Sequence, residues 1–185
     1  YFQGTAPNEN LGASIAPLGD IDQDGFDDFL AGTYGGLSMG VPGYVQARSG
    51  NSGLIIWQHS ASITGGKFGR AVTSVGDQDG DGYPDVAVSA KQENGTAGAV
   101  YLLSGVNGSL LAKYNHMTSG DELGERLCAL DDLNGDGRPE IAASAVYANT
   151  NAGLVKVLSY MAGGLVPWME VTGQAGDYMG WGLDG

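Results

Sequence analysis

One nine-residue acidic segment occurs three times in this chain of 185 residues, and its spacing constrains the fold more than any other feature. The copies read DIDQDGFDD at 20–28, DQDGDGYPD at 77–85 and DLNGDGRPE at 132–140. Their first acids stand at 20, 77 and 132, which gives periods of 57 and 55 residues. A repeat of about this length is typical of solenoids, propellers and arrays of small units.

Each segment packs several like charges into one tight turn, which repulsion opposes unless a cation lies among them. Zinc prefers His or Cys, whereas calcium takes about six to eight oxygen ligands. Gly82 permits the sharp reversal that turns the carbonyl of Tyr83 inward. An acidic surface loop without metal is the alternative, and three copies in one register disfavour it. The prediction is three Ca²⁺ sites, each formed by the side chains at positions 1, 3, 5 and 9 and the backbone carbonyl at position 7: Asp20, Asp22, Asp24, Phe26 and Asp28; Asp77, Asp79, Asp81, Tyr83 and Asp85; Asp132, Asn134, Asp136, Arg138 and Glu140.

The EF-hand also begins with D-x-D-x-D-G, but it needs a bidentate Glu at position 12 and a helix on each side. Here position 12 is Ala31, Val88 or Ala143. The segments after the loops, such as DVAVSA and EIAASA, are short apolar runs typical of strands. The EF-hand interpretation therefore fails.

Each repeat predicts four short strands: one that follows a residue–Gly pair, one after the acidic loop, and two around a Gly-rich turn. We therefore expect an all-β fold of β-propeller-type blades, each with four antiparallel strands. The expected blades are 10–64, 65–119 and 120–172, within one partial propeller domain at 5–185. Residues 173–185 repeat the start of a unit and predict the first strand of a fourth blade, while YFQG at 1–4 resembles the remnant of an engineered protease site.

The unit resembles the FG-GAP repeat of integrin α-subunits, whose pattern is Phe-Gly, a strand, G-D-x-[ND]-x-D-G-x-x-D, a second strand and Gly-Ala-Pro. KFGRAVTSVGDQDGDGYPDVAVSA matches it almost throughout, although Leu or Met replaces Phe in the other units and Gly-Ala-Pro has changed to GTY, SAK and SAV. The resemblance covers roughly residues 10 to 183. It implies a calcium-bearing propeller that binds or adheres to a ligand outside the cell, whether secreted, at the cell surface or, in a bacterium, periplasmic.

Composition excludes several other functions. The formal net charge is -13, with only 8 Lys and Arg, which disfavours binding to nucleic acid. No apolar run approaches the roughly 20 residues that span a bilayer. No catalytic motif is present, so we expect no enzymatic activity; His59 and His116 are expected at the surface, and Cys128 in the core.

The ligand stays open between a protein and a glycan. Trp57 and Trp168 occupy similar outer-strand positions, where packing is the preferred interpretation, but aromatic side chains could also stack on sugars in a lectin-like propeller. A non-catalytic propeller fragment of a larger secreted enzyme is a further alternative. Three blades cannot close a ring of about four to eight, so we expect either a longer protein or, with slight preference, self-association that completes the ring.

Overall fold

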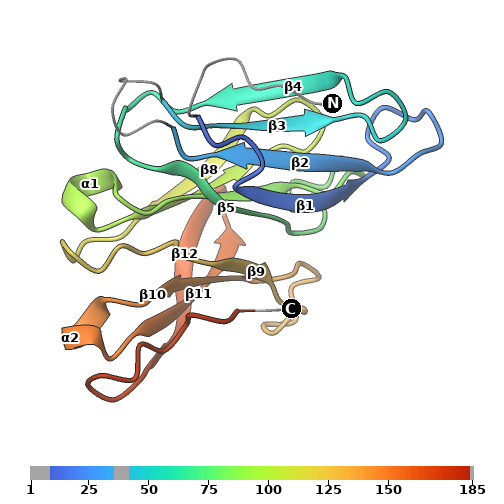
Figure 1. The fold of residues 1–185 in the computed structure, drawn as a ribbon. Coiled ribbons are helices and arrows are strands. Elements are labelled where there is room, and N and C mark those ends of the chain that lie inside the picture. The colour runs from blue at the N-terminus through green and yellow to red at the C-terminus, as the bar shows by residue number, and fades with distance from the viewer. Residues whose placement is uncertain (1–8, 36–41, 184–185) are drawn as a thin grey trace.

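The computed structural model describes residues 9–35 and 42–183, so the predicted tag remnant at 1–4 lies outside the described residues. The chain forms three four-stranded antiparallel sheets, which we call blades 1, 2 and 3 (Figure 1). This arrangement confirms the all-β prediction and is consistent with propeller blades. The strands are β1 (Ser14–Gly19), β2 (Asp28–Thr33), β3 (Tyr44–Arg48) and β4 (Ile55–Ser60) in blade 1; β5 (Phe68–Ser74), β6 (Val86–Ala90), β7 (Ala99–Leu103) and β8 (Leu110–Asn115) in blade 2; and β9 (Leu127–Ala129), β10 (Ile141–Ala145), β11 (Leu154–Met161) and β12 (Gly164–Thr172) in blade 3.

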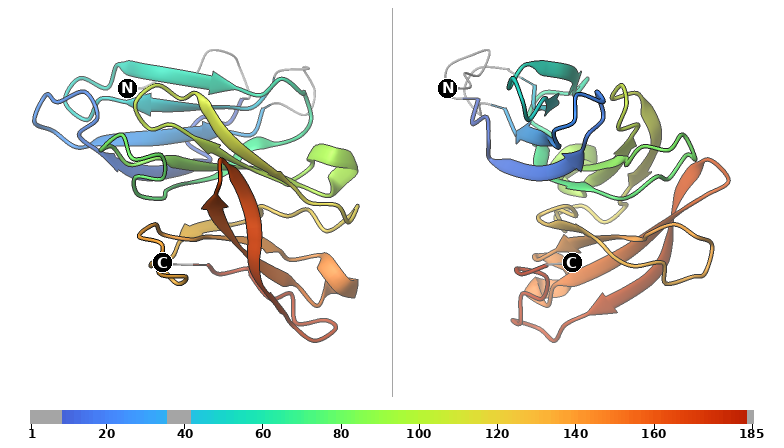
Figure 2. Two further views of the ribbon diagram at one scale, coloured as in Figure 1. Left: turned by 180° about the vertical axis from the view of Figure 1, so that it is seen from behind. Right: turned by 90° about the vertical axis from the view of Figure 1, so that its right-hand side faces the viewer.

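The core lies between the sheets, as two clusters of buried side chains. Alternate residues of blade 2 point to opposite faces, so Tyr101 and Leu103 pack toward blade 1 while Val100 and Leu102 pack toward blade 3. Burial on both faces explains why β6 and β7 are almost continuously apolar. The sheets stack in chain order, as the two views of Figure 2 show.

The residue–Gly pairs join each blade to the one before it. Leu123 forms a bridge with Gly98 of blade 2, and a Cβ on Gly124 would lie 2.6 Å from the Cβ of Ser89. Since Gly124 also has a φ of +106°, no other residue fits there without strain. Glycine thus permits the close approach of successive blades.

The predicted fourth-blade strand is not formed within the described part of 173–185. Met179 forms a single bridge with Gly153, which repeats the way Leu123 meets blade 2. Strand β9 begins four residues after Leu123, and the same offset from Met179 reaches Leu183, at the edge of the described residues. Residues 173–183 therefore repeat this bridge to the preceding blade, and they contain no strand.

Two four-residue turns labelled α1 (Glu93–Thr96) and α2 (Ala148–Asn151) join the second and third strands of blades 2 and 3. Their backbones are left-handed, with φ of +54° at Asn94 and +60° at Thr150. The sequence patterns do not predict these turns, although Asn and Gly tolerate this conformation. In Figure 1 both turns lie at one end of the blades, and the acidic loop between β1 and β2 lies at the other end.

The two tryptophans differ more than the sequence suggested. Trp57 is buried, as predicted for packing, and its Nε1–H donates to the carbonyl of Gly105 at 2.6 Å, across the contact between blades 1 and 2. Trp168 is 39 % exposed. Trp57 pairs with Ala47 of β3. The residue of β11 that corresponds to Ala47 is Val157, and it pairs with Met169 rather than with Trp168. The positions are therefore offset by one residue.

The expectation that both histidines lie at the surface was wrong. His116 is buried, and its Nε2 lies 2.7 Å from Oδ2 of Asp121, because the segment between blades 2 and 3 folds back on itself. His59 is half-buried, with Nδ1 2.8 Å from the carbonyl oxygen of Gly108. Cys128 is buried, as predicted.

Candidate metal centres

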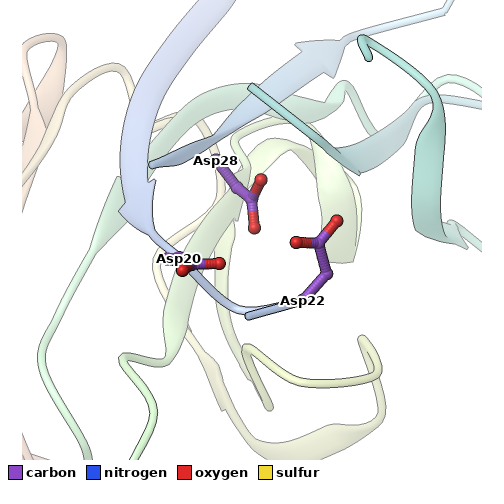
Figure 3. A group of neighbouring side chains, drawn as sticks. All are labelled: Asp20, Asp22 and Asp28. Atoms are coloured by element: carbon purple, nitrogen blue, oxygen red, sulfur yellow. The ribbon is translucent and has the colours of Figure 1, made fainter. Parts of the chain in front are cut away.

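The structure gathers three acids from each acidic loop, with one carboxylate oxygen of each within 4.8 Å of the others. Each loop joins the first two strands of its blade, and in the first loop the three side chains point toward one another (Figure 3). We call these groups cluster 1 (Asp20, Asp22, Asp28), cluster 2 (Asp77, Asp79, Asp85) and cluster 3 (Asp132, Asp136, Glu140).

Backbone amides within each loop hold the first acid in place. In the second loop, Oδ1 of Asp77 accepts hydrogen bonds from the amides of Gly80 and Asp81 at 2.7 and 3.1 Å, and Oδ2 accepts one from Gly82 at 2.8 Å. The third loop repeats all three contacts, and the first loop repeats the last two. The sequence of short turn-forming residues thus fixes each loop around its first carboxylate.

The closing acid of each cluster is the buried member. Asp28, Asp85 and Glu140 are exposed by only 2 %, 0 % and 0 %. The middle acid of each cluster is exposed to solvent: Asp22, Asp79 and Asp136. Oδ2 of Asp85 accepts from the amide of Gln78 at 2.8 Å, and Oδ1 accepts from Gly105 at 3.0 Å. Because Gly105 lies in the turn between β7 and β8, the closing acid ties the loop to the outer strands of its blade.

The ligand sets predicted from the sequence do not include this turn between the outer strands. Gly50 donates its amide to Asp28 Oδ1 at 3.0 Å, and Ser159 Oγ lies 2.9 Å from Asn134 Nδ2. The regular position of Ser49, Ser104 and Ser159 in the repeats was the signal available for finding it.

The buried carboxylate of cluster 2 lacks a positively charged partner. Burial raises the pKa of Asp85 to about 6, and the hydrogen bonds from the amides of Gly105 and Gln78, which lower it, do not cancel that effect. A buried carboxylate with a raised pKa is one whose charge the protein alone does not stabilise, and a bound cation would stabilise it. The candidate metal-ligand atoms are all oxygens, which calcium prefers and zinc does not. The residues therefore fit a hard divalent cation.

Cluster 3 differs from the other two at the third position of its loop. Asn134 donates hydrogen bonds from its Nδ2 to Glu140 Oε1 at 2.6 Å and to Asp136 Oδ2 at 3.2 Å, and these bonds offset part of the repulsion between the two acids. Asp24 and Asp81 were also predicted as ligands. They lie in the first and second acidic loops, but they are not among the three carboxylates of clusters 1 and 2. The carbonyls of Phe26, Tyr83 and Arg138 remain predicted ligands.

A different polar group joins blades 2 and 3 near the left-handed turns. Glu125 is buried and forms ion pairs with Lys91, at 2.7 Å, and with Arg70. Lys91 also pairs with Glu122 at 2.8 Å. Burial by itself raises the pKa of Glu125, but the hydrogen bond and charge of Lys91, with those of Arg70, outweigh it and hold the pKa below its usual range. This group therefore stabilises the contact between the blades while Glu125 is ionised.

Comparison with known proteins agrees with these repeated centres. The FG-GAP repeat model matches residues 68–103 and 123–158, which include the second and third acidic loops. These two segments are therefore FG-GAP repeats, and the chain resembles the proteins that carry such repeats. Within that class it is similar to integrin α-subunits: 30 % identity to human integrin alpha-X over 77 % of this chain, 30 % to mouse integrin alpha-M over 78 %, and 26 % to Xenopus laevis integrin alpha-4 over 76 %. It spans only 13 %, 14 % and 15 % of the lengths of these relatives.

Solved structures share the fold at low sequence identity. A Bacillus licheniformis rhamnogalacturonan lyase aligns with a TM-score of 0.56 and 15 % identity, and an exotype rhamnogalacturonan lyase aligns with 0.54 and 16 %. Each alignment covers 84 % of this chain and about a third of the other. Among the described residues, no helix has the length and apolarity needed to cross a membrane.

Proposed function

We propose that this chain is a calcium-stabilised, non-catalytic binding module that acts outside the cell. The observation that carries the proposal is the repetition of one all-oxygen centre at the same corner of three blades, each with a buried closing acid. The proposed Ca²⁺ ligands are those that the sequence predicts, with the closing acids Asp28, Asp85 and Glu140 at their centre.

The role of the metal in this proposal is structural. Calcium supplies positive charge that offsets the repulsion among carboxylates. The loop amides orient the first acid, while the closing acid links the loop to the turn between the outer strands in blades 1 and 2. Binding at these loops thus stabilises the blade as a whole, and stability rises with calcium through linkage. At affinities of about 10⁻⁴ to 10⁻³ M, the sites fill outside cells and stay largely empty in cytosol.

Isothermal titration calorimetry of chelator-treated protein tests this proposal. We expect three equivalents of Ca²⁺ to bind and no comparable heat with Zn²⁺. Thermal unfolding should shift upward with calcium and return with EDTA. Absence of calcium binding, together with a melting temperature that EDTA does not change, would refute the structural role of the metal.

The bound partner is proposed as a protein ligand, by analogy with the integrin α relatives. A second candidate is a propeller part of a larger secreted polysaccharide-acting enzyme, favoured by the fold shared with rhamnogalacturonan lyases. A glycan array that includes rhamnogalacturonan fragments, run with calcium and with chelator, separates the two. Binding restricted to those fragments, or lyase activity on the polysaccharide, would favour the second candidate over a non-catalytic protein-binding module.

We also propose that a second copy covers the outer surface of blade 3. Strand β12 exposes Trp168, Met169 and Val171 by 39 %, 44 % and 47 %, more apolar surface than the corresponding strands of blades 1 and 2 present. Light scattering after size-exclusion chromatography tests this idea. A strict monomer at high concentration would instead favour coverage by further blades of a longer chain.

A further inference from the structure

One buried side chain, that of Gln78, connects the second acidic loop with the third. Its Nε2 donates to the carbonyl of Val75 at 2.7 Å and to the carbonyl of Pro139 at 2.8 Å. Pro139 directly precedes Glu140, the closing acid of cluster 3. The backbone amide of Gln78 donates to Oδ2 of Asp85, the closing acid of cluster 2, at 2.8 Å. A single residue therefore contacts one closing acid and the residue beside the next.

The fold itself does not require a glutamine here. The equivalent residues in the other two loops are Ile21 and Leu133, both apolar. Gln78 is fully buried, and its Oε1 has no hydrogen-bond partner among the described residues. Leaving such an oxygen unsatisfied lowers the stability of the folded chain, because the oxygen loses the hydrogen bonds that it makes to water when exposed. Since an apolar side chain would avoid that cost, the contribution of Gln78 lies in its two donated hydrogen bonds, one of which crosses to blade 3.

We propose that Gln78 is a positioning residue that couples cation binding at cluster 2 to cation binding at cluster 3. A cation at cluster 2 would hold Asp85 in place. Because Asp85 accepts a hydrogen bond from the backbone amide of Gln78, Gln78 would be held in place as well. The Gln78 side chain then holds the Pro139 carbonyl, and so places Glu140 for the second cation. The inference rests on the proposed calcium binding and adds positive cooperativity between two neighbouring loops, which must be reciprocal.

The contact between the first and second loops provides an internal comparison. There the apolar Ile21 replaces Gln78, and the loops are joined by a hydrogen bond from Gln23 Nε2 to the hydroxyl of Tyr83. Gln23 is exposed and Tyr83 is half-buried, so water competes for this bond. Coupling between clusters 1 and 2 is therefore weaker than coupling between clusters 2 and 3.

A calcium titration followed by ¹⁵N–¹H NMR can resolve the three loops separately. The amides of Gly25, Gly82 and Gly137 each donate to the first acid of their loop, at 2.9, 2.8 and 2.8 Å, and so report on that loop. Asp79→Ala weakens calcium binding at the second loop. In the protein that keeps Gln78, we expect this change to raise the midpoint at Gly137, the calcium concentration at half-maximal response, by about fivefold or more. For Gly25 the increase should be less than about twofold.

The same comparison in Gln78→Leu, which copies Leu133, should leave the Gly137 midpoint unchanged by Asp79→Ala. Reciprocity requires Asp136→Ala to raise the Gly82 midpoint by the same factor. If the Leu variant does not fold, Gln78→Met replaces the side chain at similar length without its donors. The coupling alone would be overturned if all three loops bind calcium but Asp79→Ala leaves the midpoint at Gly137 unchanged. It would also be overturned if Asp79→Ala shifts that midpoint equally with and without Gln78. No response at any of the three amides would overturn the proposed calcium binding as well.

Discussion

Removal of the exposed carboxylate of Asp79 should destabilise the protein much more in the presence of calcium than in its absence. In the metal-free chain this side chain makes one hydrogen bond, from the amide of Asp81 to its Oδ1 at 3.1 Å, so Asp79→Ala costs about 1 kcal/mol or less. With a dissociation constant of about 10⁻⁴ M, 10 mM calcium adds about 2.7 kcal/mol per site. A roughly 100-fold loss of affinity leaves about 0.4 kcal/mol of that stabilisation.

The difference of about 2.3 kcal/mol corresponds to a fall in melting temperature of about 5–9 °C for a chain of this size. Differential scanning calorimetry in 10 mM calcium and in EDTA measures it, and in EDTA the variant should melt within about 4 °C of the parent protein. Asp131→Ala is the matched control, because it removes an exposed acid outside the three clusters. Equal losses for Asp79→Ala in calcium and in EDTA, or a calcium-specific loss in the control, would refute the assignment of cluster 2 as a metal centre.

Three further substitutions probe the contacts around the centres. Trp57→Phe leaves the carbonyl of Gly105 without its donor and should lower the free energy of unfolding by about 1–3 kcal/mol in urea titrations, with or without calcium; no change would show that the bond between the blades contributes little. Glu125→Gln should cost about 1–3 kcal/mol at pH 7. Because the folded pKa of Glu125 is lowered, its contribution is complete above about pH 4.5 and fades at lower pH, so the gap between variant and parent should narrow toward pH 3; a constant gap would contradict the ion pair with Lys91. Thr150→Gly should raise the melting temperature by about 2–4 °C, since this β-branched residue is left-handed at φ +60°; a decrease would show that its side chain makes a compensating contact.

The repeat carried enough information to predict the sheets because both of its signals are local. Acids at alternate positions identify the turn, and the apolar runs on each side, such as the one that became β6, identify the strands that it joins. The Cα pairing of β5, β6, β7 and β8 in chain order then follows from short connections. Prediction of the all-β fold thus depended on spacing and alternation, and required no knowledge of long-range contacts.

The contacts that the sequence did not reveal join residues far apart in the chain or depend on backbone conformation. The burial of His116 depends on how the connector after blade 2 folds back to Asp121. The link from Gly105 to Asp85 joins two turns 20 residues apart. The left-handed turn at Asn94 depends on the strands that flank it, because Asn also occurs in ordinary turns. Such contacts are set by tertiary structure, which overrides local preference.

The position of the closing acids gives the acidic loops a wider role than a local turn. In blade 2, Asp85 lies where the inner strand pair meets the outer turn, and its two oxygens accept amides from both. A charge buried at that junction is unfavourable without a counter-charge and favourable with one, so the same residue makes the metal-free blade weaker and the loaded blade stronger. Gln78 extends this dependence to the next blade, because the bond that it donates to Pro139 begins at the residue that Asp85 holds. Stability that passes from blade to blade in this way should make calcium control the cohesion of the stack as well as the order of each loop.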